Sequence, residues 1–213
     1  MEPWLKKYPK TWHVPSSPGT HNDDKRFKNM NHFIGKEVVF LEKMDGENCS
    51  MSPKKIWARS LDSVDHLSRH LVKGIWGNIA YKIPTDWRIC GENLYAEHSI
   101  QYESLESFFQ VFNIWDENNV AISWDDTLML CKELELKTVP ILYRGLYSEE
   151  KLNEIISSLD LTKQEGVVVR NVESFKFEDF TKNVAKWVRK GHVQTDEHWM
   201  SKPVVPNKLK SLL

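Results

Sequence analysis

The sequence lacks the features that mark several classes of protein. It contains only 3 cysteines in 213 residues, Cys49, Cys90 and Cys131, and their odd number and wide spacing predict neither a disulfide framework nor a zinc site. Reduced thiols in the core or near a site are expected instead. No stretch is apolar enough to span a bilayer, and the first residues lack the apolar run of a secretory signal. These absences predict a soluble, cytoplasmic protein without a membrane partner.

Net charge is also nearly absent, because 29 Lys and Arg balance 30 Asp and Glu to give a formal net charge of -1. No overall basic field therefore marks a nucleic-acid-binding protein, although local clusters of Lys and Arg can still form a binding face. With 40% hydrophobic residues, the chain can bury one full core. One domain, or one domain with an appendage, is expected.

Apolar periodicity predicts an α+β fold. Two or three strands are expected within 38–59, and further strands at 87–95, 107–115, 166–170 and 183–189. Many of them adjoin through short turns. Mixed or antiparallel sheets flanked by helices therefore fit the pattern better than a doubly wound parallel sheet.

Three amphipathic helices are expected between these strands. The first covers residues 63–80 and carries one apolar stripe, formed by Val64, Leu67, Leu71 and Ile75. The second begins at Ser123, with Asp126 in the third position of a capping box, and ends near residue 134. The third begins at Ser148, with two glutamates in its first turn.

Composition divides the chain into an N-terminal arm (1–35), a folded domain (36–200) and a C-terminal tail (201–213). The arm is rich in Pro, Ser, Gly and charge and shows no lasting period. We expect it to wrap the core with its aromatic side chains, Trp4, Tyr8 and Trp12. The alternative is that it covers a site with its charged residues Asp23, Asp24, Lys25 and Arg26.

Lys43 follows an apolar, β-branched stretch and opens the run Lys43-x-Asp45-Gly46. Taken alone, this run predicts a solvated hairpin turn closed by Asp-Gly. A lysine amine at a strand end can also act as a nucleophile, but only when it is unprotonated, and a free lysine has a pKa near ~10.4. Partial burial and neighbouring cations, including a bound metal, are expected to lower the pKa of Lys43. Gly46 would allow a sharp turn or a close approach to a ligand.

Further polar side chains fall in or beside the predicted strands. Arg59 suits a bidentate contact with a phosphate, and a surface arginine is the equal alternative. Glu92 lies in an otherwise apolar strand, where an unpaired charge is costly unless it binds a ribose hydroxyl or a cation. Glu165 stands at the start of a buried strand as a metal ligand would, or as an acid facing water. Lys186 lies within an apolar run and needs an anion or a route to solvent.

The order of these residues carries a resemblance. The series Lys43-x-Asp45-Gly46, Gly91-Glu92, Phe112-Asn113, Glu165-Gly166 and Lys186 resembles the ordered motifs of the covalent nucleotidyltransferases, the superfamily of ATP-dependent ligases and mRNA-capping enzymes. Asn48, fifth after the nucleophile, is similar to the T4 RNA ligase 2 family, whereas DNA ligases and capping enzymes usually carry arginine there. The stretch from Ala185 through His192 to Trp199 adds a softer similarity to RNA ligases.

The resemblance implies a mixed α+β, ATP-grasp-like nucleotidyltransferase (adenylylation) domain that lacks an oligonucleotide-binding (OB) domain. Lys43 would attack the α-phosphorus of ATP, Glu165 would bind Mg²⁺ or Mn²⁺, and Lys186 would bind the α-phosphate. The remaining nucleotide contacts implied are Glu42 and Phe112 at the adenine, Glu92 at the ribose, and Asn48 and Arg59 at phosphates or metal-bound waters.

The implied activity is an ATP-dependent RNA ligase that joins RNA 3'-hydroxyl and 5'-phosphate ends through a lysyl-AMP intermediate. A monomer is expected, with RNA/DNA hybrids left open as substrates. The alternatives are a minimal DNA ligase, a guanylyltransferase-like enzyme, or a binding module without turnover. Two departures stand out: Val188 occupies the position where the family usually has a second lysine, leaving Arg189 or Lys190 as substitutes, and the tail is too short for an OB barrel.

Overall fold

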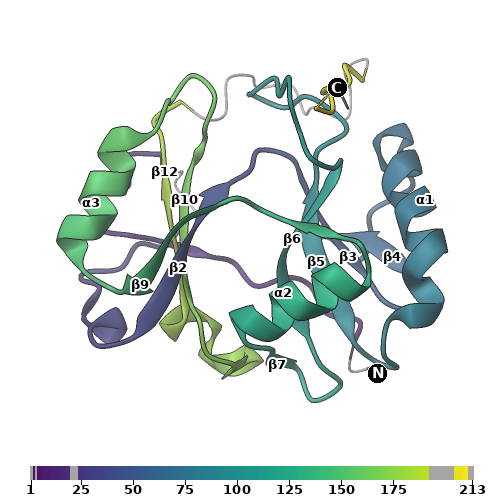
Figure 1. Cartoon of the computed structure of the whole chain (residues 1–213), viewed down its shortest axis with the longest axis horizontal. Helices are drawn as coiled ribbons and strands as arrows, with labels where there is room; N and C mark the ends of the chain where they lie inside the picture. Colours follow the sequence, from purple (N-terminus) through teal and green to yellow (C-terminus); the bar gives the residue numbers. More distant parts are fainter. Residues whose placement is uncertain (1, 3, 20–23, 192–203, 211–213) are drawn as a thin grey trace.

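Two β-sheets face each other in the computed structural model, which describes residues 2, 4–19, 24–191 and 204–210 (Figure 1). Sheet A has the order β1-β12-β10-β2-β9. Its strands are β1 (Trp12–His13), β12 (Val184–Val188), β10 (Gly166–Asn171), β2 (Glu37–Lys43) and β9 (Ile141–Leu146). Apart from the parallel pair of β1 and β12, all neighbours in sheet A are antiparallel.

Sheet B has the order β11-β7-β6-β5-β3-β4, with β8 beside β6. Its strands are β3 (Glu47–Met51), β4 (Ile56–Ala58), β5 (Arg88–Asn93), β6 (Phe109–Trp115), β7 (Val120–Ala121), β8 (Lys137–Thr138) and β11 (Phe175–Lys176). The expected strands are all present, and the α+β class with mixed, mainly antiparallel sheets is confirmed. Strand β9, which forms an edge of sheet A, and the two-residue strands were not predicted from the sequence.

Helices α3 (Glu149–Ser158) and α1 (His70–Ile79) cover the outer faces of sheets A and B, where they pack Leu152 and Val72 (Figure 1). Helix α2 (Trp124–Glu133) contributes Cys131 to the core on sheet B and Trp124 to a cluster between the sheets. Short 3-10 turns occur at Asn31–Phe33, Leu67–Arg69, Ala80–Lys82 and Phe177–Lys182. The helices α2 and α3 begin after Ser123 and Ser148, as expected, because both serine hydroxyls accept a backbone N–H of the first turn.

The prediction of a helix over residues 63–80 is wrong in its first turns and in its buried face. Val64, Leu67 and Leu71 of the proposed stripe are 71%, 66% and 44% exposed, and Val72 and Ile79 are buried instead. The cause is tertiary, because the side chain of Arg69 reaches back to the carbonyl of Val64 and holds this segment out of the helix.

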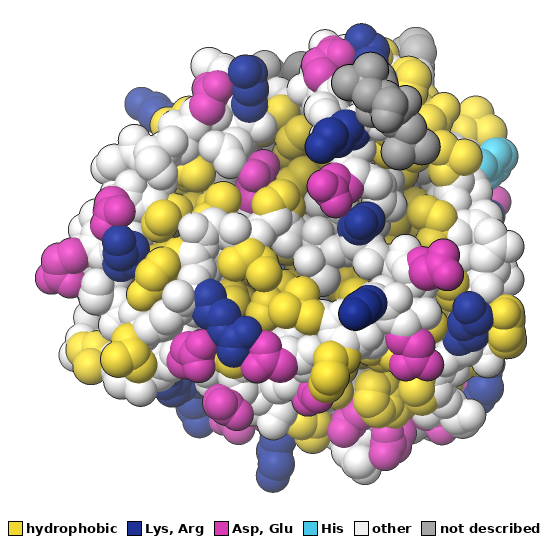
Figure 2. Space-filling view, viewed as in Figure 1, with side chains coloured by type: hydrophobic (Ala, Val, Ile, Leu, Met, Phe, Trp, Pro, Cys, Tyr) yellow, Lys and Arg dark blue, Asp and Glu magenta, His cyan; other side chains and the backbone are white. Residues whose placement is uncertain are grey.

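The space between the sheets is filled by two further apolar clusters, one around Leu41 and Trp124 and one around Trp115 and Phe180. All three cysteines are free and buried, as expected. Acidic and basic side chains are interspersed on the face shown in Figure 2, in line with the balanced composition. In the part of the chain that is described, no helix is long and apolar enough to cross a membrane.

Candidate nucleotide-binding site

Strand alternation aims polar side chains of both sheets into the space between them. Successive residues of a strand point to opposite faces. Lys43, two places after the inward-facing Leu41 in β2, therefore also points into the space between the sheets. Across sheet A, Leu41, Val168 and Lys186 stand in one row of the ladder. On sheet B, Asn48 of β3 is the cross-strand partner of Glu92 of β5. The two sheets therefore present opposed polar faces.

A pocket of about 360 Å³ lies between these faces. Its lining includes every nucleotide-binding residue expected from the sequence, namely Glu42, Lys43, Asn48, Arg59, Glu92, Phe112 and Lys186. Glu165 is not part of this lining, but its carboxylate lies beside Lys43. The tertiary structure thus gathers residues that span 144 positions of sequence from Glu42 to Lys186 into one cavity of the size typical for small-ligand sites.

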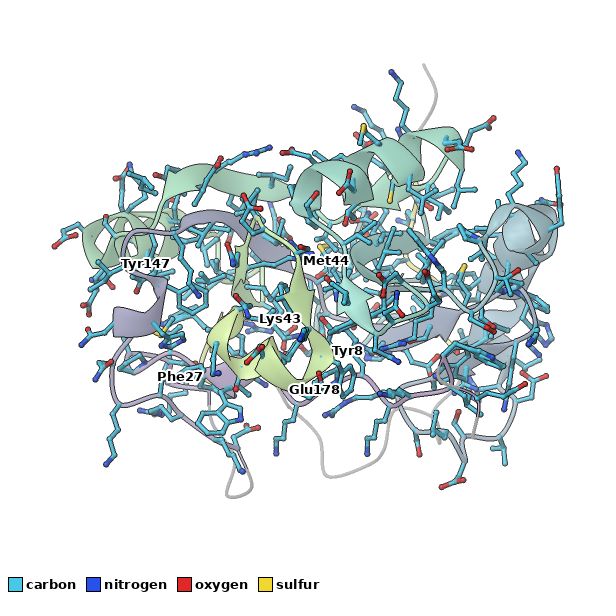
Figure 3. All side chains as sticks on the ribbon, turned by 90° about the horizontal axis from the view of Figure 1, so that it is seen from below. Tyr8, Phe27, Lys43, Met44, Tyr147 and Glu178 are labelled. Atoms are coloured by element: carbon cyan, nitrogen blue, oxygen red, sulfur yellow. The ribbon has the colours of Figure 1, made fainter. Side chains whose placement is uncertain are left out.

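Lys43 and Glu165 form a partly buried ion pair, with Lys43 Nζ 2.5 Å from Glu165 Oε2. The strands β2 and β10 bring them together, because Gly166 is the register partner of Lys43. Glu165 is only 3% exposed. In Figure 3, Lys43 lies near the middle of the molecule with Tyr8 beside it.

The expectation of a lowered Lys43 pKa is wrong for this arrangement. Burial does lower the pKa of Lys43, but the charges of Glu165, Glu92 and Asp45 and the hydrogen bond to Glu165 outweigh burial and raise it above the ordinary value. The amine is therefore held as an ammonium. Burial raises the pKa of Glu165, and the charge of Lys43 opposes that shift.

Glu92 and Asn48 form the opposite wall. Burial raises the pKa of Glu92 to about 8, against the opposing charge of Lys43. The Oδ1 atom of Asn48 is buried and has no hydrogen-bond partner among the described residues. A buried acceptor of this kind is costly unless a ligand or bound cation satisfies it, so its place in the pocket wall indicates a binding function.

Lys186 lies on the inner face of β12, where burial and the charge of Lys43 lower its pKa. Its Nζ is 4.0 Å from a carboxylate oxygen of Asp24. Asp24 lines the pocket and also pairs with Lys10 and His13. In the same arm, the rings of Trp4 and Tyr8 pack against core side chains while Asp24 lines the pocket.

Of the other charged residues expected to cover the site, Lys25 and Arg26 lie elsewhere. Arg26 donates to the carbonyls of Pro15 and Ser17, and Lys25 lies over the ring of Trp12. Neither lines the pocket. Asp23 lies outside the described residues.

Several lining residues were not identified from the sequence. The main ones are Tyr8, Pro9, Lys10 and Thr11 of the arm, and Arg170. Arg170 is two residues after Val168, so alternation along β10 alone would have placed it on the inner face. Its buried guanidinium donates to Asn113 and to the carbonyls of Asn171 and Ile122, and burial lowers its pKa to about 10.

Glu42 is held by a residue with no sequence signal. Gln164 Nε2 donates to Glu42 Oε2 at 2.8 Å from the loop before β10. Gly46 has a different role from the ligand approach considered above, because a Cβ there would collide with the carbonyl oxygen of Asn93 in β5. Its size is required for packing of the β2–β3 connection.

The residues at the end of β12 show which cation can stand in for the second lysine that the family usually has at the position of Val188. Val188 is buried, and Lys190 is exposed. Arg189 donates to Ser99 Oγ at 3.3 Å, and the Ser99 hydroxyl and amide both donate to Asp45. Arg189 is thus the cation nearer the Lys43 loop. The stretch from His192 to Trp199 lies outside the described residues.

A divalent cation would find oxygen donors in this site. The carboxylate of Glu165 and the unpartnered Oδ1 of Asn48 are hard ligands of the kind that Mg²⁺ and Mn²⁺ prefer. No group of three or more His, Cys, Asp or Glu that could hold a metal occurs among the described residues. The donor set therefore fits a cation bound by few protein ligands together with water and substrate oxygens.

Solved structures with the same fold are ligases. An archaeal ATP-dependent RNA ligase (form 2) is similar over 87% of this chain and 48% of its own, with a TM-score of 0.62 and 16% identity. Naegleria gruberi RNA ligase with PPi is similar over 87% of this chain and 58% of its own, with a TM-score of 0.56 and 19% identity. A mutant of that ligase with ATP and Mn is similar over 75% of this chain and 51% of its own, with a TM-score of 0.53 and 18% identity. This chain thus spans about half the length of the solved chains it matches.

The family can be assigned from the sequence match. No curated protein matches the chain significantly. A family model described as RNA ligase matches residues 36–188, which include β2 through β12 and every expected site residue. The chain belongs to the RNA ligase family.

Proposed function

We propose that the chain is an ATP-dependent RNA ligase that joins RNA 3'-hydroxyl and 5'-phosphate ends through a lysyl-AMP intermediate on Lys43. The observation that carries the proposal is the pocket itself. Its wall unites Lys43, Lys186 and the five other expected nucleotide-binding residues, and the Lys43 amine is paired with buried Glu165.

The first step forms a bond between Lys43 Nζ and the α-phosphorus of ATP, while the bond from that phosphorus to the bridging oxygen breaks and pyrophosphate leaves. The amine must first lose a proton, and Glu165 is the acceptor within hydrogen-bond distance. Lys186 offsets negative charge on the α-phosphate. A divalent cation at Glu165 would withdraw that carboxylate's charge from Lys43, lower the pKa of the amine, and neutralise phosphate oxygens.

The rest of the pocket orients the nucleotide. Phe112 offers a ring for stacking on the adenine, and the Glu42 carboxylate, which accepts a hydrogen bond from Gln164, also lines the pocket. Glu92 suits a ribose hydroxyl because a carboxyl group can accept or, when protonated, donate a hydrogen bond. Asn48 and Arg59 supply further donors for phosphate oxygens.

The next steps transfer the nucleotide. An oxygen of the RNA 5'-phosphate attacks the phosphorus of lysyl-AMP, the P–N bond breaks, and Lys43 regains its proton. A 3'-hydroxyl then attacks the 5'-phosphate, and AMP leaves as the strand is sealed. We expect RNA rather than DNA as substrate, because Asn48 resembles the asparagine of the T4 RNA ligase 2 family and not the arginine usual in DNA ligases.

Incubation with α-labelled ATP and Mg²⁺ is expected to leave label on the protein. Lys43→Ala and Lys43→Arg should both abolish labelling, because arginine keeps the charge but is not nucleophilic at neutral pH. Lys163→Ala is the matched control, since this lysine is exposed and pairs only with Asp160 among the contacts described. Label that persists in Lys43→Arg would refute the assignment.

Substrate class needs a separate test. Sealing is expected on nicked or single-stranded RNA with 5'-phosphate ends, with lower rates on DNA and with GTP in place of ATP. Labelling without sealing on any substrate would instead identify a nucleotidyltransferase or binding module. Preference for GTP would identify a guanylyltransferase, and preference for nicked DNA would identify a DNA ligase.

A further inference from the structure

The N-terminal arm connects the two sheets across the pocket. At one end, Trp4 packs on Trp57 of β4 in sheet B, with ring centroids 5.6 Å apart. At the other end, β1 (Trp12–His13) pairs in parallel with β12 of sheet A, opposite Ala185 and Lys186. The residues between these anchors, Tyr8 to Thr11, line the pocket.

The middle of the arm touches two side chains assigned to the nucleotide. The Tyr8 ring lies edge-on to Phe112, with centroids 5.0 Å apart and planes at 74°, and also contacts Phe180 at 5.4 Å. The carbonyl oxygen of Tyr8 accepts a hydrogen bond from Arg59 Nε at 3.4 Å. One residue of the arm therefore contacts both Phe112, assigned to the base, and Arg59, assigned to a phosphate.

We propose that the arm forms a wall of the nucleotide site and that Tyr8 positions Phe112 for stacking on the purine. The inference rests on the proposed function. An edge-on aromatic neighbour fixes the plane of the Phe112 ring, so the ring does not have to be ordered when a base binds. Without that neighbour the ring can rotate, and nucleotide affinity falls while the chemistry at Lys43 is unchanged.

The test compares Tyr8→Ala with Tyr8→Phe, which keeps the ring. ATP affinity is measured by calorimetry, and the rate of adenylylation is measured against ATP concentration. We expect Tyr8→Ala to raise Kd and KM about five- to tenfold with kcat within about twofold, and Tyr8→Phe to stay within about twofold of the parent protein. Tyr147→Ala is the control for lost stability, because Tyr147 packs in the core on the outer face of sheet A.

The outcomes separate the two proposals. If the parent protein binds ATP but forms no adduct, and Tyr8→Ala still weakens binding, the positioning role stands and the proposed ligase chemistry fails. Unchanged or tighter ATP binding in Tyr8→Ala overturns the positioning role. So does an equal loss of affinity in Tyr147→Ala, which would show that the effect follows stability. A parent protein that binds no ATP overturns both.

Discussion

Several carboxylates surround the single amine of Lys43. Glu165 is hydrogen-bonded to Lys43, while Glu92 and Asp45 act on it through their charge. Such a cluster stabilises the ammonium in the absence of nucleotide and so keeps the amine from reacting. Activation therefore requires that charge be removed or neutralised on the carboxylate side, which makes the protonation of these acids the property to measure.

Glu92 should make the protein less stable as pH rises. Its pKa is about 8 in the folded protein against an ordinary value of 4.5, so both states carry the proton below pH 4.5, and the unfolded chain loses it first above that value. Stability is therefore lost between about pH 4.5 and 8. Glu92→Gln cannot ionise, so it should match the parent at pH 4.5 and exceed its melting temperature by roughly 10 °C at pH 8.5.

Thermal melts of both proteins across this pH range check the prediction. A difference in melting temperature that is the same at both ends would show that Glu92 does not titrate in this window. Gln110→Glu is not a suitable control, because Gln110 is itself buried beside Glu92 in the ladder. Glu97→Gln is suitable, since Glu97 lies outside the pocket lining.

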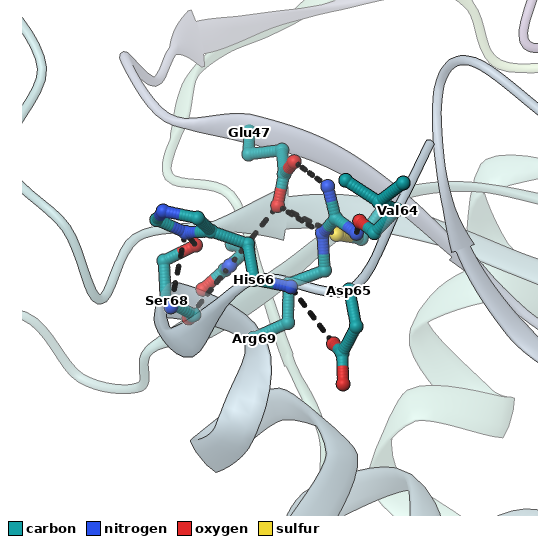
Figure 4. A network of polar contacts seen from close by, with 8 residues as sticks. Glu47, Val64, Asp65, His66, Ser68 and Arg69 are labelled. Carbon is teal, nitrogen blue, oxygen red and sulfur yellow. Dashed lines mark hydrogen bonds and ion pairs between the residues drawn. The ribbon is translucent and has the colours of Figure 1, made fainter. Parts of the chain in front are cut away.

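At the scale of elements, a buried ion pair joins the segment before α1 to sheet B. Arg69 donates from Nε and Nη2 to the two carboxylate oxygens of Glu47 at 2.8 and 2.5 Å, and from Nη1 to the carbonyl of Val64 (Figure 4). Glu47 directly precedes Asn48 in β3. The pair therefore fixes both the non-helical backbone near Val64 and the start of a strand that lines the pocket.

Arg69→Ala should lower the free energy of unfolding by about 3–5 kcal/mol, because it leaves a buried carboxylate without its partner. The side chains of Arg69 and Glu47 are only 5% and 10% exposed. The matched control is Arg144→Ala, whose exposed bidentate pair with Asp125 should be worth less than about 1 kcal/mol. Urea unfolding of both variants gives the comparison, and equal losses would contradict the account.

At the scale of the whole molecule, a segment near the C-terminus returns to the loop beside the Lys43 turn. Asn207 is buried, accepts from the amide of Tyr102 and donates to the carbonyls of Leu94 and Ala96. The Tyr102 hydroxyl in turn accepts from the amide of Asp45. Residues 204–210 thus support the backbone that carries the nucleophile, although they lie more than 150 positions away in sequence.

Asn207→Ala should cost about 2 kcal/mol of stability and raise amide exchange at 95–105, because three hydrogen bonds of buried backbone groups lose their partner. Hydrogen exchange with mass spectrometry measures amide exchange in residues 95–105 and in the C-terminal segment 204–210. Asn118→Ala is the control, since Asn118 is exposed in a turn. Unchanged exchange at 95–105 would show that the C-terminal segment does not support this loop.

The sequence by itself predicted the longer strands except β9, two of the three helices, and seven of the residues that line the pocket. Strand alternation is a local property, so an inward Leu41 already places Lys43, and a serine before an apolar helix already marks its start. The local sequence does not determine which apolar side chains of residues 63–80 are buried. Their burial depended on Arg69, whose carboxylate partner is 22 residues away.

Only the tertiary structure decided what surrounds the amine. Charges act through space, so the pairing of Lys43 with Glu165, 122 positions away, reversed the direction of pKa shift expected from burial. The same holds for the arm, whose aromatic residues show no period, and whose Tyr8 reaches the pocket because the two ends of the arm are held by Trp57 and β12. Sequence patterns specify which face a side chain takes, and long-range packing specifies what that face meets.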